Sequence, residues 1–268
     1  MASIDINNIL AQSNVKMLRN LPPFAVRWIK RIIYLNEINK ELENLHNRKG
    51  SEFHNAILES LNIEVEYKGI ENLPENSRCF FVANHPFGIL DGLMLTKMLL
   101  EKYGDCKAIG NVAFDYIPQL RPYVISNPSD PQKHKEFALE MDRIFASITA
   151  VSHFPAGYVS RLFKGKIRDI PWKKTFVSKA ITHQRDIVPM HFEGKNSNLF
   201  YIVNMIRRLL GIKMNIEYVL LPHELFNKKN RKYTLIIGKP ISFTSLDNSK
   251  NHQDWANEIR KISYSFIR

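Results

Sequence analysis

The chain has 268 residues, and its 44% hydrophobic and 11% aromatic content is enough for a sizeable core, which excludes a disordered chain. A formal net charge of +12 favours polyanionic partners: nucleic acid, anionic lipid surfaces, or acidic and phosphorylated ligands. The only two cysteines, Cys79 and Cys106, show no CxxC spacing, which argues against a disulfide scaffold or a cysteine-based zinc site.

The first twenty residues lack the basic-then-apolar order of a signal peptide. No run of the sequence approaches the ~20 apolar residues that span a bilayer. We therefore expect a protein that is made in the cytosol and stays there, with the possibility of touching a membrane surface.

Residues 15–35 contain five basic residues and no acidic one. Apolar positions recur there at helical spacing: Phe24, Trp28, Ile32 and Leu35. The basic side chains fall mostly on the other side of the predicted helix. Two interpretations stay open: a helix packed on its own domain, or a helix lying in a membrane interface with its basic face toward the headgroups.

From residue 62 onward, predicted strands alternate with predicted helices. Strands are expected over 62–67, 78–83, 187–192, 215–221 and 233–237, with shorter apolar runs at 107–110, 122–125 and 149–154. Helices are expected over 52–61, 91–103, 131–147, 172–183 and 253–266. This alternation predicts an α/β body (61–268) with helices packed on a central sheet, preceded by a helical N-terminal region (1–60).

The stretch FVANHPFGILDG, residues 81–92, leaves the strand predicted at 78–83. Pro86 cannot continue a strand ladder, Gly88 allows a tight bend, and Asp91 is expected at the N-cap of the next helix. In one interpretation Asp91 only caps the helix and His85 is an ordinary loop residue. In the other, Asp91 holds one imidazole nitrogen and leaves the second as a base for a substrate hydroxyl.

Several other chemistries lack their motifs in this chain. There is no HExxH or close histidine cluster for a metal, no GxSxG nucleophile elbow, no GxGxxG fingerprint and no Walker loop. These absences weaken the metalloenzyme, serine-hydrolase, dinucleotide-binding and P-loop interpretations.

A second informative stretch covers residues 153–177. A strand is expected to end at Phe154-Pro155, Gly157 gives a turn, and Ser160 and Arg161 follow. Six basic residues lie between Arg161 and Lys174, opposed only by Asp169. The segment is either a solvated basic loop or a pocket for an anionic group, with Arg161 as a bidentate donor and Ser160 as a hydrogen-bond partner.

The strand DIVPMHF, residues 186–192, has Pro189 inside it, which on its own indicates an edge strand. However, the order of the three blocks resembles the lysophospholipid acyltransferase superfamily, relatives of 1-acylglycerol-3-phosphate acyltransferase, over about residues 60–245. That family carries NH-x4-D, then FPEG-x-x-S, then a VP strand. The resemblance implies an α/β fold with a central mixed sheet flanked by helices.

The resemblance also implies residue roles. His85 and Asp91 would be catalytic, and no metal would be bound. The substrate-binding positions would be Asn84, Gly88, Phe154, Pro155, Gly157, Ser160, Arg161 and Pro189. Backbone N–H groups between Pro86 and Gly92, or near Gly157, would stabilise the oxyanion.

The chain departs from the family pattern in three places: the first concerns the geometry of the His85–Asp91 pair, and the other two concern the acceptor. The His85-to-Asp91 loop is one residue longer than usual, and Ala156 replaces the glutamate of FPEG. Residues 125–127, which align loosely with a phosphate-binding motif, contain no arginine. A glycerol-3-phosphate-like acceptor is therefore doubtful.

The variant NHPFG-x-LDG with FPAG-x-VSR resembles a narrower branch, the putative hemolysins, which includes O-acyltransferases of bacterial glycine- and ornithine-lipid synthesis. There the acceptor is the 3-hydroxyl of an N-acylated amino acid, whose carboxylate Arg161 would pair with. The acyl donor would be a thioester of acyl carrier protein or coenzyme A, with no bound cofactor.

The same resemblance implies a peripheral protein at the cytoplasmic face of the inner membrane, attached to the anionic surface by its basic N-terminal helix. A 1-acylglycerol-3-phosphate or other lysophospholipid acyltransferase is the alternative. A basic nucleic-acid-binding protein is a distant one, because the basic stretches at 164–174 and 228–232 come without a recognition motif, and we expect no nucleic-acid partner.

Overall fold

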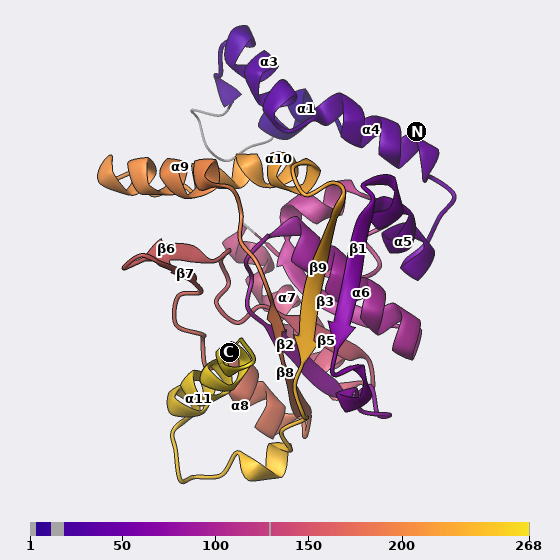
Figure 1. The fold of residues 1–268 in the computed structure, drawn as a ribbon, viewed down its shortest axis with the longest axis vertical. Coiled ribbons are helices and arrows are strands. Elements are labelled where there is room, and N and C mark those ends of the chain that lie inside the picture. Colours follow the sequence, from indigo (N-terminus) through magenta and orange to yellow (C-terminus); the bar gives the residue numbers. More distant parts are fainter. Residues whose placement is uncertain (1–3, 12–18, 129, 268) are drawn as a thin grey trace.

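A seven-stranded sheet lies at the centre of the computed structural model, which describes residues 4–11, 19–128 and 130–267 (Figure 1). The strand order is β1-β9-β8-β2-β5-β3-β4. Their bounds are Ile63–Lys68 (β1), Cys79–Ala83 (β2), Cys106–Asn111 (β3), Val124–Asn127 (β4), Ala150–His153 (β5), Asp186–Phe192 (β8) and Arg231–Ile237 (β9). Strand β8 runs parallel to β2 and antiparallel to β9, so the predicted mixed sheet is confirmed.

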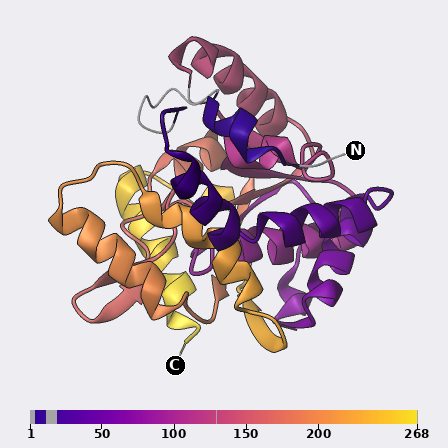
Figure 2. The same cartoon turned by 90° about the horizontal axis from the view of Figure 1, so that it is seen from above.

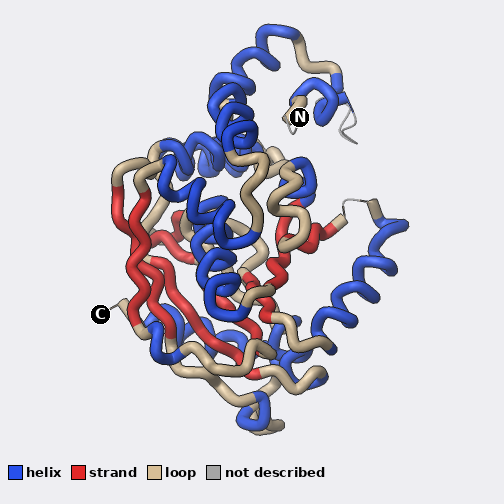
Figure 3. The backbone as a smooth tube through the Cα atoms, turned by 90° about the vertical axis from the view of Figure 1, so that its right-hand side faces the viewer, coloured by secondary structure: helices blue, strands red, loops and turns tan. Residues whose placement is uncertain are grey.

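Strand β2 is buried on both faces, which is the reason for its unbroken apolar sequence. Phe81 and Ala83 pack with helices α5 (Gly50–Ser60) and α6 (Ile89–Tyr103). Phe80 and Val82 pack on the opposite face with α7 (His134–Ala146), α8 (Thr175–Thr182) and α11 (His252–Ser265). The predicted flanking helices are therefore confirmed, as two layers enclosing the sheet (Figure 3).

Several further elements lie toward one end of the sheet (Figure 1). They are α1 (Ile6–Ala11), α3 (Pro23–Ile32), α4 (Leu35–Asn44), the hairpin β6 (Arg161–Phe163) with β7 (Lys166–Arg168), α9 (Asn198–Leu209), the 3₁₀ turn η4 (Ile216–Leu220) and α10 (Leu221–Phe226). Of the helices in the described ranges, none is long and apolar enough to cross a membrane.

The strand predicted at 215–221 is wrong. The segment forms η4 and the start of α10, because Glu217 turns inward as a fully buried residue that pairs with two arginines. A short apolar run does not distinguish strand from helix by periodicity alone. The sequence analysis also missed α9, although its N-cap Ser197 accepts a hydrogen bond from the Phe200 N–H.

Pro189 does not lie in an edge strand, because β8 is between β9 and β2. The β8–β9 ladder covers Met190–Phe192 and resumes only at the Ile187–Ile241 bridge. Pro189 lies in this gap, where its carbonyl accepts a hydrogen bond from the Gly238 N–H at 2.8 Å. The N and C=O of a strand residue point to the same side, so the missing N–H faces the break in the ladder and costs no ladder bond.

Candidate active site

His85 and Asp91 are in contact despite the longer loop. His85 Nδ1 lies 2.7 Å from Asp91 Oδ2, the Asp91 side chain is fully buried, and that of His85 is 17% exposed. Helix α6 begins at Ile89, two residues before Asp91, so the predicted N-cap position of Asp91 is wrong. This helix start places Asp91 in the first turn of α6, where its carboxylate reaches the imidazole.

The Asp91 carboxylate also organises the loop itself. Its Oδ2 atom accepts hydrogen bonds from the backbone N–H groups of Phe87 and Gly88, both at 2.9 Å. Gly88 has φ 87°, a conformation that only glycine adopts without strain. Asp91 therefore stabilises the helix N-terminus and orients the histidine with one oxygen, so the two interpretations of its role are compatible.

Two further segments fix the position of His85. The Phe154 ring stacks on the imidazole with centroids 4.0 Å apart and planes 19° apart. The His85 carbonyl accepts a hydrogen bond from the Ser160 N–H at 2.8 Å, and the His85 N–H donates to Asp169 Oδ1 at 3.2 Å. In the described parts of the chain, Nε2 has no hydrogen-bond partner, so it is the ring nitrogen available to a substrate.

Asp169 contacts the site but was not among the site residues predicted from the sequence. Its buried carboxylate accepts hydrogen bonds from Ser160 Oγ at 2.6 Å and Trp172 Nε1 at 2.9 Å, in addition to the His85 N–H. Burial raises the pKa of this carboxyl, against the lowering effect of its hydrogen bonds. The available signal was the single acid within a basic segment.

Asn84 links the ends of β2 and β8. Its amide nitrogen donates to the Phe192 carbonyl at 3.0 Å, and its oxygen accepts from the Phe192 N–H at 2.7 Å. The same nitrogen lies 3.4 Å from Nε2 of His191, whose pKa burial lowers to about 4. Asn84 is itself buried, so the structure gives it a role in holding two strand ends together, one residue before His85.

Ser160 and Arg161 both have partners inside the protein. Ser160 Oγ donates to Asp169, while Arg161 Nη2 pairs with Glu217 Oε1 at 2.8 Å. The Arg161 guanidinium lies over the rings of Phe200 and Tyr218. Since Glu217 came from a segment predicted as a strand, this partner was not foreseeable from the sequence.

The other predicted site residues form the surrounding backbone. The Pro155 carbonyl accepts from the Lys173 N–H at 3.1 Å, and Gly157, with φ 69°, donates its N–H to the Phe154 carbonyl at 2.9 Å. Pro189 pairs with Val82 in the β2–β8 ladder, three residues before His85. The N–H groups of Phe87, Gly88 and Gly157 are all engaged, so none of these three is available to an oxyanion.

The arrangement therefore offers a histidine base in a dry, hydrogen-bonded setting. Nothing in the described ranges forms a cluster of three His, Cys, Asp or Glu side chains that could hold a metal ion. Cys79 and Cys106 are buried, and burial raises the pKa of each thiol to about 12, which makes both poor nucleophiles. The chemistry that fits is removal of a proton from a substrate group by His85.

Comparison with known proteins identifies the family of the chain. A family model described as Acyltransferase matches residues 8–268. The chain is 38% identical to a lyso-glycine lipid O-acyltransferase of Phocaeicola vulgatus, over 97% of this chain and 94% of that protein. It is 37% identical to a protein of the same name from Bacteroides thetaiotaomicron, over 97% and 96% of the two chains.

A solved structure is similar in fold. The crystal structure of the 1-acyl-sn-glycerophosphate acyltransferase PlsC from Thermotoga maritima superposes with a TM-score of 0.50 and 15% identity, covering 91% of this chain and 90% of that one. The predicted α/β architecture is thus confirmed by a protein of distant sequence.

Proposed function

The chain belongs to the acyltransferase family, and we propose that it transfers a fatty acyl group from a thioester to the hydroxyl of a lyso-lipid built on an N-acylated amino acid, with glycine as the first choice. The observation that carries the proposal is the His85–Asp91 contact at 2.7 Å, in a chain that matches lyso-glycine lipid O-acyltransferases over nearly its full length.

Two features of the chain favour this acceptor over a glycerol phosphate. Strand β4, which aligns loosely with the phosphate-binding motif, contains no arginine. Ala156, where the wider family has a glutamate, is fully buried in the cluster that contains Trp172 and Phe176. An acceptor without a phosphomonoester needs neither of the missing charged groups.

In the proposed reaction, His85 Nε2 takes the proton from the acceptor hydroxyl as its oxygen attacks the thioester carbonyl carbon. The carbon–oxygen bond forms, the carbon–sulfur bond breaks, and the imidazolium returns the proton to the thiolate that leaves. Asp91, 2.7 Å from Nδ1, stabilises the imidazolium while it exists. No covalent acyl-enzyme is required, which suits a site whose cysteines are buried and whose Ser160 is bonded to Asp169.

An acyltransferase requires an acyl donor and an acceptor, and here the donor is a thioester of acyl carrier protein or of coenzyme A. The net charge of +12 suits the acidic carrier protein and the phosphates of coenzyme A equally. The lyso-lipid acceptor and its acylated product both reside in a bilayer, so we propose that the protein is a peripheral enzyme at the cytoplasmic face of the inner membrane.

The test is lipid mass spectrometry of a host that expresses the wild type or His85→Ala and receives the N-acylated amino acid precursors. We expect O-acylated product with the wild type, and about 10²–10⁴-fold less with His85→Ala. His252→Ala, which alters an exposed histidine at the start of α11, is the matched control and should behave as wild type. Accumulation of phosphatidic acid instead would keep the enzyme class and overturn the acceptor.

A further inference from the structure

Helix α9 exposes most of its aliphatic side chains and buries polar ones, the reverse of a surface helix in an ordinary globular domain. Leu199, Ile202, Met205, Ile206 and Leu209 are between 46% and 79% exposed. The face toward the protein contains Phe200 and Tyr201, but also the polar Asn204 and Arg207. A surface helix normally buries its apolar face and exposes its polar one, so this orientation requires a reason.

The reason is a buried carboxylate beneath the helix. Glu217 of η4 is fully buried and pairs with Arg207 Nε at 2.9 Å, with Arg161 at 2.8 Å and with the Asn204 amide at 2.9 Å. Rolling α9 to bury its aliphatic side chains would remove two of these partners from a buried charge. The network therefore locks the aliphatic face outward.

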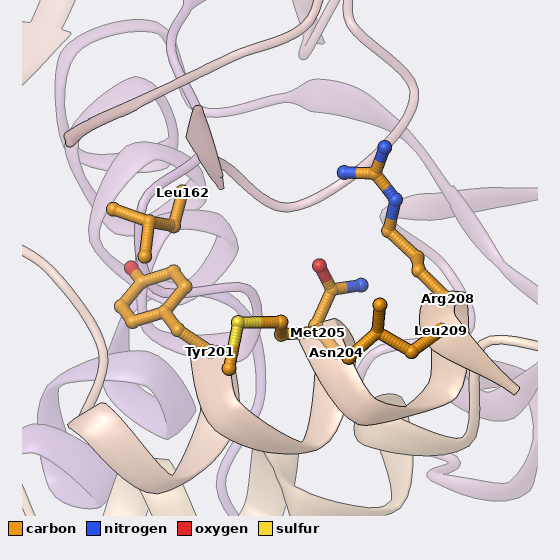
Figure 4. A pocket seen from close by; sticks show the side chains of 6 residues that line it. All are labelled: Leu162, Tyr201, Asn204, Met205, Arg208 and Leu209. Atoms are coloured by element: carbon orange, nitrogen blue, oxygen red, sulfur yellow. The ribbon is translucent and has the colours of Figure 1, made fainter. Parts of the chain in front are cut away.

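The hairpin of β6 and β7 extends this face. In Figures 1 and 2 it lies beside α9, at the side where both project from the body. Leu162 and Phe163, at 43% and 53% exposure, add apolar area. A hollow of about 290 Å³ lies between Leu162 and the α9 side chains Tyr201, Asn204, Met205, Arg208 and Leu209 (Figure 4). Such a contiguous exposed apolar patch marks an interaction surface.

The charges around this face are of one sign. Residues 161–168 and 194–216 contain no Asp or Glu. The exposed bases along these two segments are Lys164, Lys166, Lys195, Arg208 and Lys213. Two copies meeting through this face would set the same cations against each other, whereas an anionic lipid surface complements both the aliphatic side chains and the cations.

We propose that α9 and the β6–β7 hairpin dock on an anionic phospholipid bilayer. The aliphatic side chains of α9, with Leu162 and Phe163, enter the acyl boundary, and Arg208 pairs with a headgroup phosphate at the rim of the hollow. Helix α3 contributes from an adjacent position, since it contacts η4 and exposes Phe24 and Trp28 at 67% and 66%.

This face adjoins the histidine loop. Leu162 follows Ser160 by two residues, and the Ser160 N–H donates to the His85 carbonyl. On the α9 side, the Asn196 amide donates to the Phe87 carbonyl at 3.4 Å. Docking through α9 therefore places His85 close to the bilayer from which a lipid substrate arrives. This docking face rests on the proposed membrane location and names the surface responsible for it, and vesicle binding is measurable without any acyl transfer.

The experiment is vesicle flotation with the full chain, using phosphatidylcholine alone and a 3:1 mixture with phosphatidylglycerol. We expect wild type to partition at least tenfold more strongly to the mixed vesicles, and Ile206→Glu/Leu209→Glu to lose at least tenfold of that binding. Ile148→Glu is the matched control, because Ile148 is 74% exposed at the amino end of β5, the opposite end of the sheet from the histidine loop. His85→Ala should bind as wild type, which separates docking from catalysis.

The proposal would be overturned if the double variant bound vesicles as well as wild type, or if wild type bound both kinds of vesicle equally. It would also be overturned if wild type bound no vesicles but formed a dimer in light scattering that the double variant did not form. A carrier protein captured through this face, with no vesicle binding, would assign the face to a protein partner. Should the glutamate pair not fold, Ile206→Ser/Leu209→Ser provides the same comparison, since both positions are exposed.

Discussion

Helices α6 and α9 leave the carboxyl ends of two neighbouring parallel strands, β2 and β8, yet they present their apolar residues in opposite directions. In α6, leucines and methionines fill the core, and the one charged side chain of the first turn is the buried Asp91. In α9, the equivalent aliphatic residues face outward, and the protein side holds Asn204 and Arg207.

The difference shows that polar anchors decide helix orientation here as much as apolar content does. Asp91 lies at the helix start, where the backbone N–H groups of Phe87 and Gly88 donate to its Oδ2 atom, and the rest of α6 packs in the core. Arg207 lies near the end of α9 and is held by Glu217, which fixes the rotation of that helix. One helix thus supports the His85–Asp91 contact, and the other exposes an apolar face.

Removal of the α6 anchor should give the largest effect. Asp91→Asn keeps the size of the side chain but loses the charge that stabilises the imidazolium, so we expect kcat to fall about 10²–10⁴-fold. Steady-state rates with an acyl thioester and lyso-lipid measure this, and Asp142→Asn, at a surface ion pair, is the control. A rate within threefold of wild type would show that the dyad is structural only.

The same leucine-to-alanine truncation in α6 and in α9 should have very different effects on stability. Leu95 is fully buried in α6, and Leu209 is 79% exposed in α9. We expect Leu95→Ala to lower the free energy of unfolding by about 2–5 kcal/mol, because it leaves a cavity, and Leu209→Ala to change it by about 0.5 kcal/mol or less. Urea unfolding without lipid measures both, and equal losses would mean that the α9 face is covered in solution.

The smallest expected effect concerns the carboxyl ends of β2 and β8, where Nε2 of His191 lies 3.4 Å from the side-chain amide nitrogen of Asn84. Burial lowers the folded-state pKa of His191 to about 4 from 6.5, so the unfolded chain binds the proton more readily between these values. Stability is fully present above pH 6.5 and is lost as the pH falls toward 4.

Between pH 7 and 5.5 this histidine should contribute a loss of about 1 kcal/mol. His153, whose pKa burial also lowers to about 4, acts in the same direction. Unfolding free energies at the two pH values, for wild type and His191→Asn, isolate the contribution. An unchanged difference in the variant would show that His191 is not the group that titrates.

Local pattern predicted most of the fold: β2 has the unbroken apolar sequence of a strand buried on both faces, and α11 has a helical periodicity that matches its burial. The His85–Asp91 pair was also predictable from its motif, although the start of α6 was not. Two partners in the site, Glu217 and Asp169, were not predicted, because their burial depends on tertiary contacts with Arg161 and with Ser160 and His85. The apolar spacing of α9 was visible in the sequence, but its outward rotation depends on Glu217 in another element.

Strand β1 has a consequence for the timing of folding. Among the strands in the described ranges it pairs only with β9, and their partners, such as Glu66 and Thr234, are 168 positions apart. At ordinary ribosomal speeds that interval takes roughly 8–34 s, during which β1 has no strand to pair with. The growing chain must therefore keep β1 from pairing elsewhere until β9 emerges. The protein is thus most prone to aggregation as a nascent chain, while β1 is an unpaired strand.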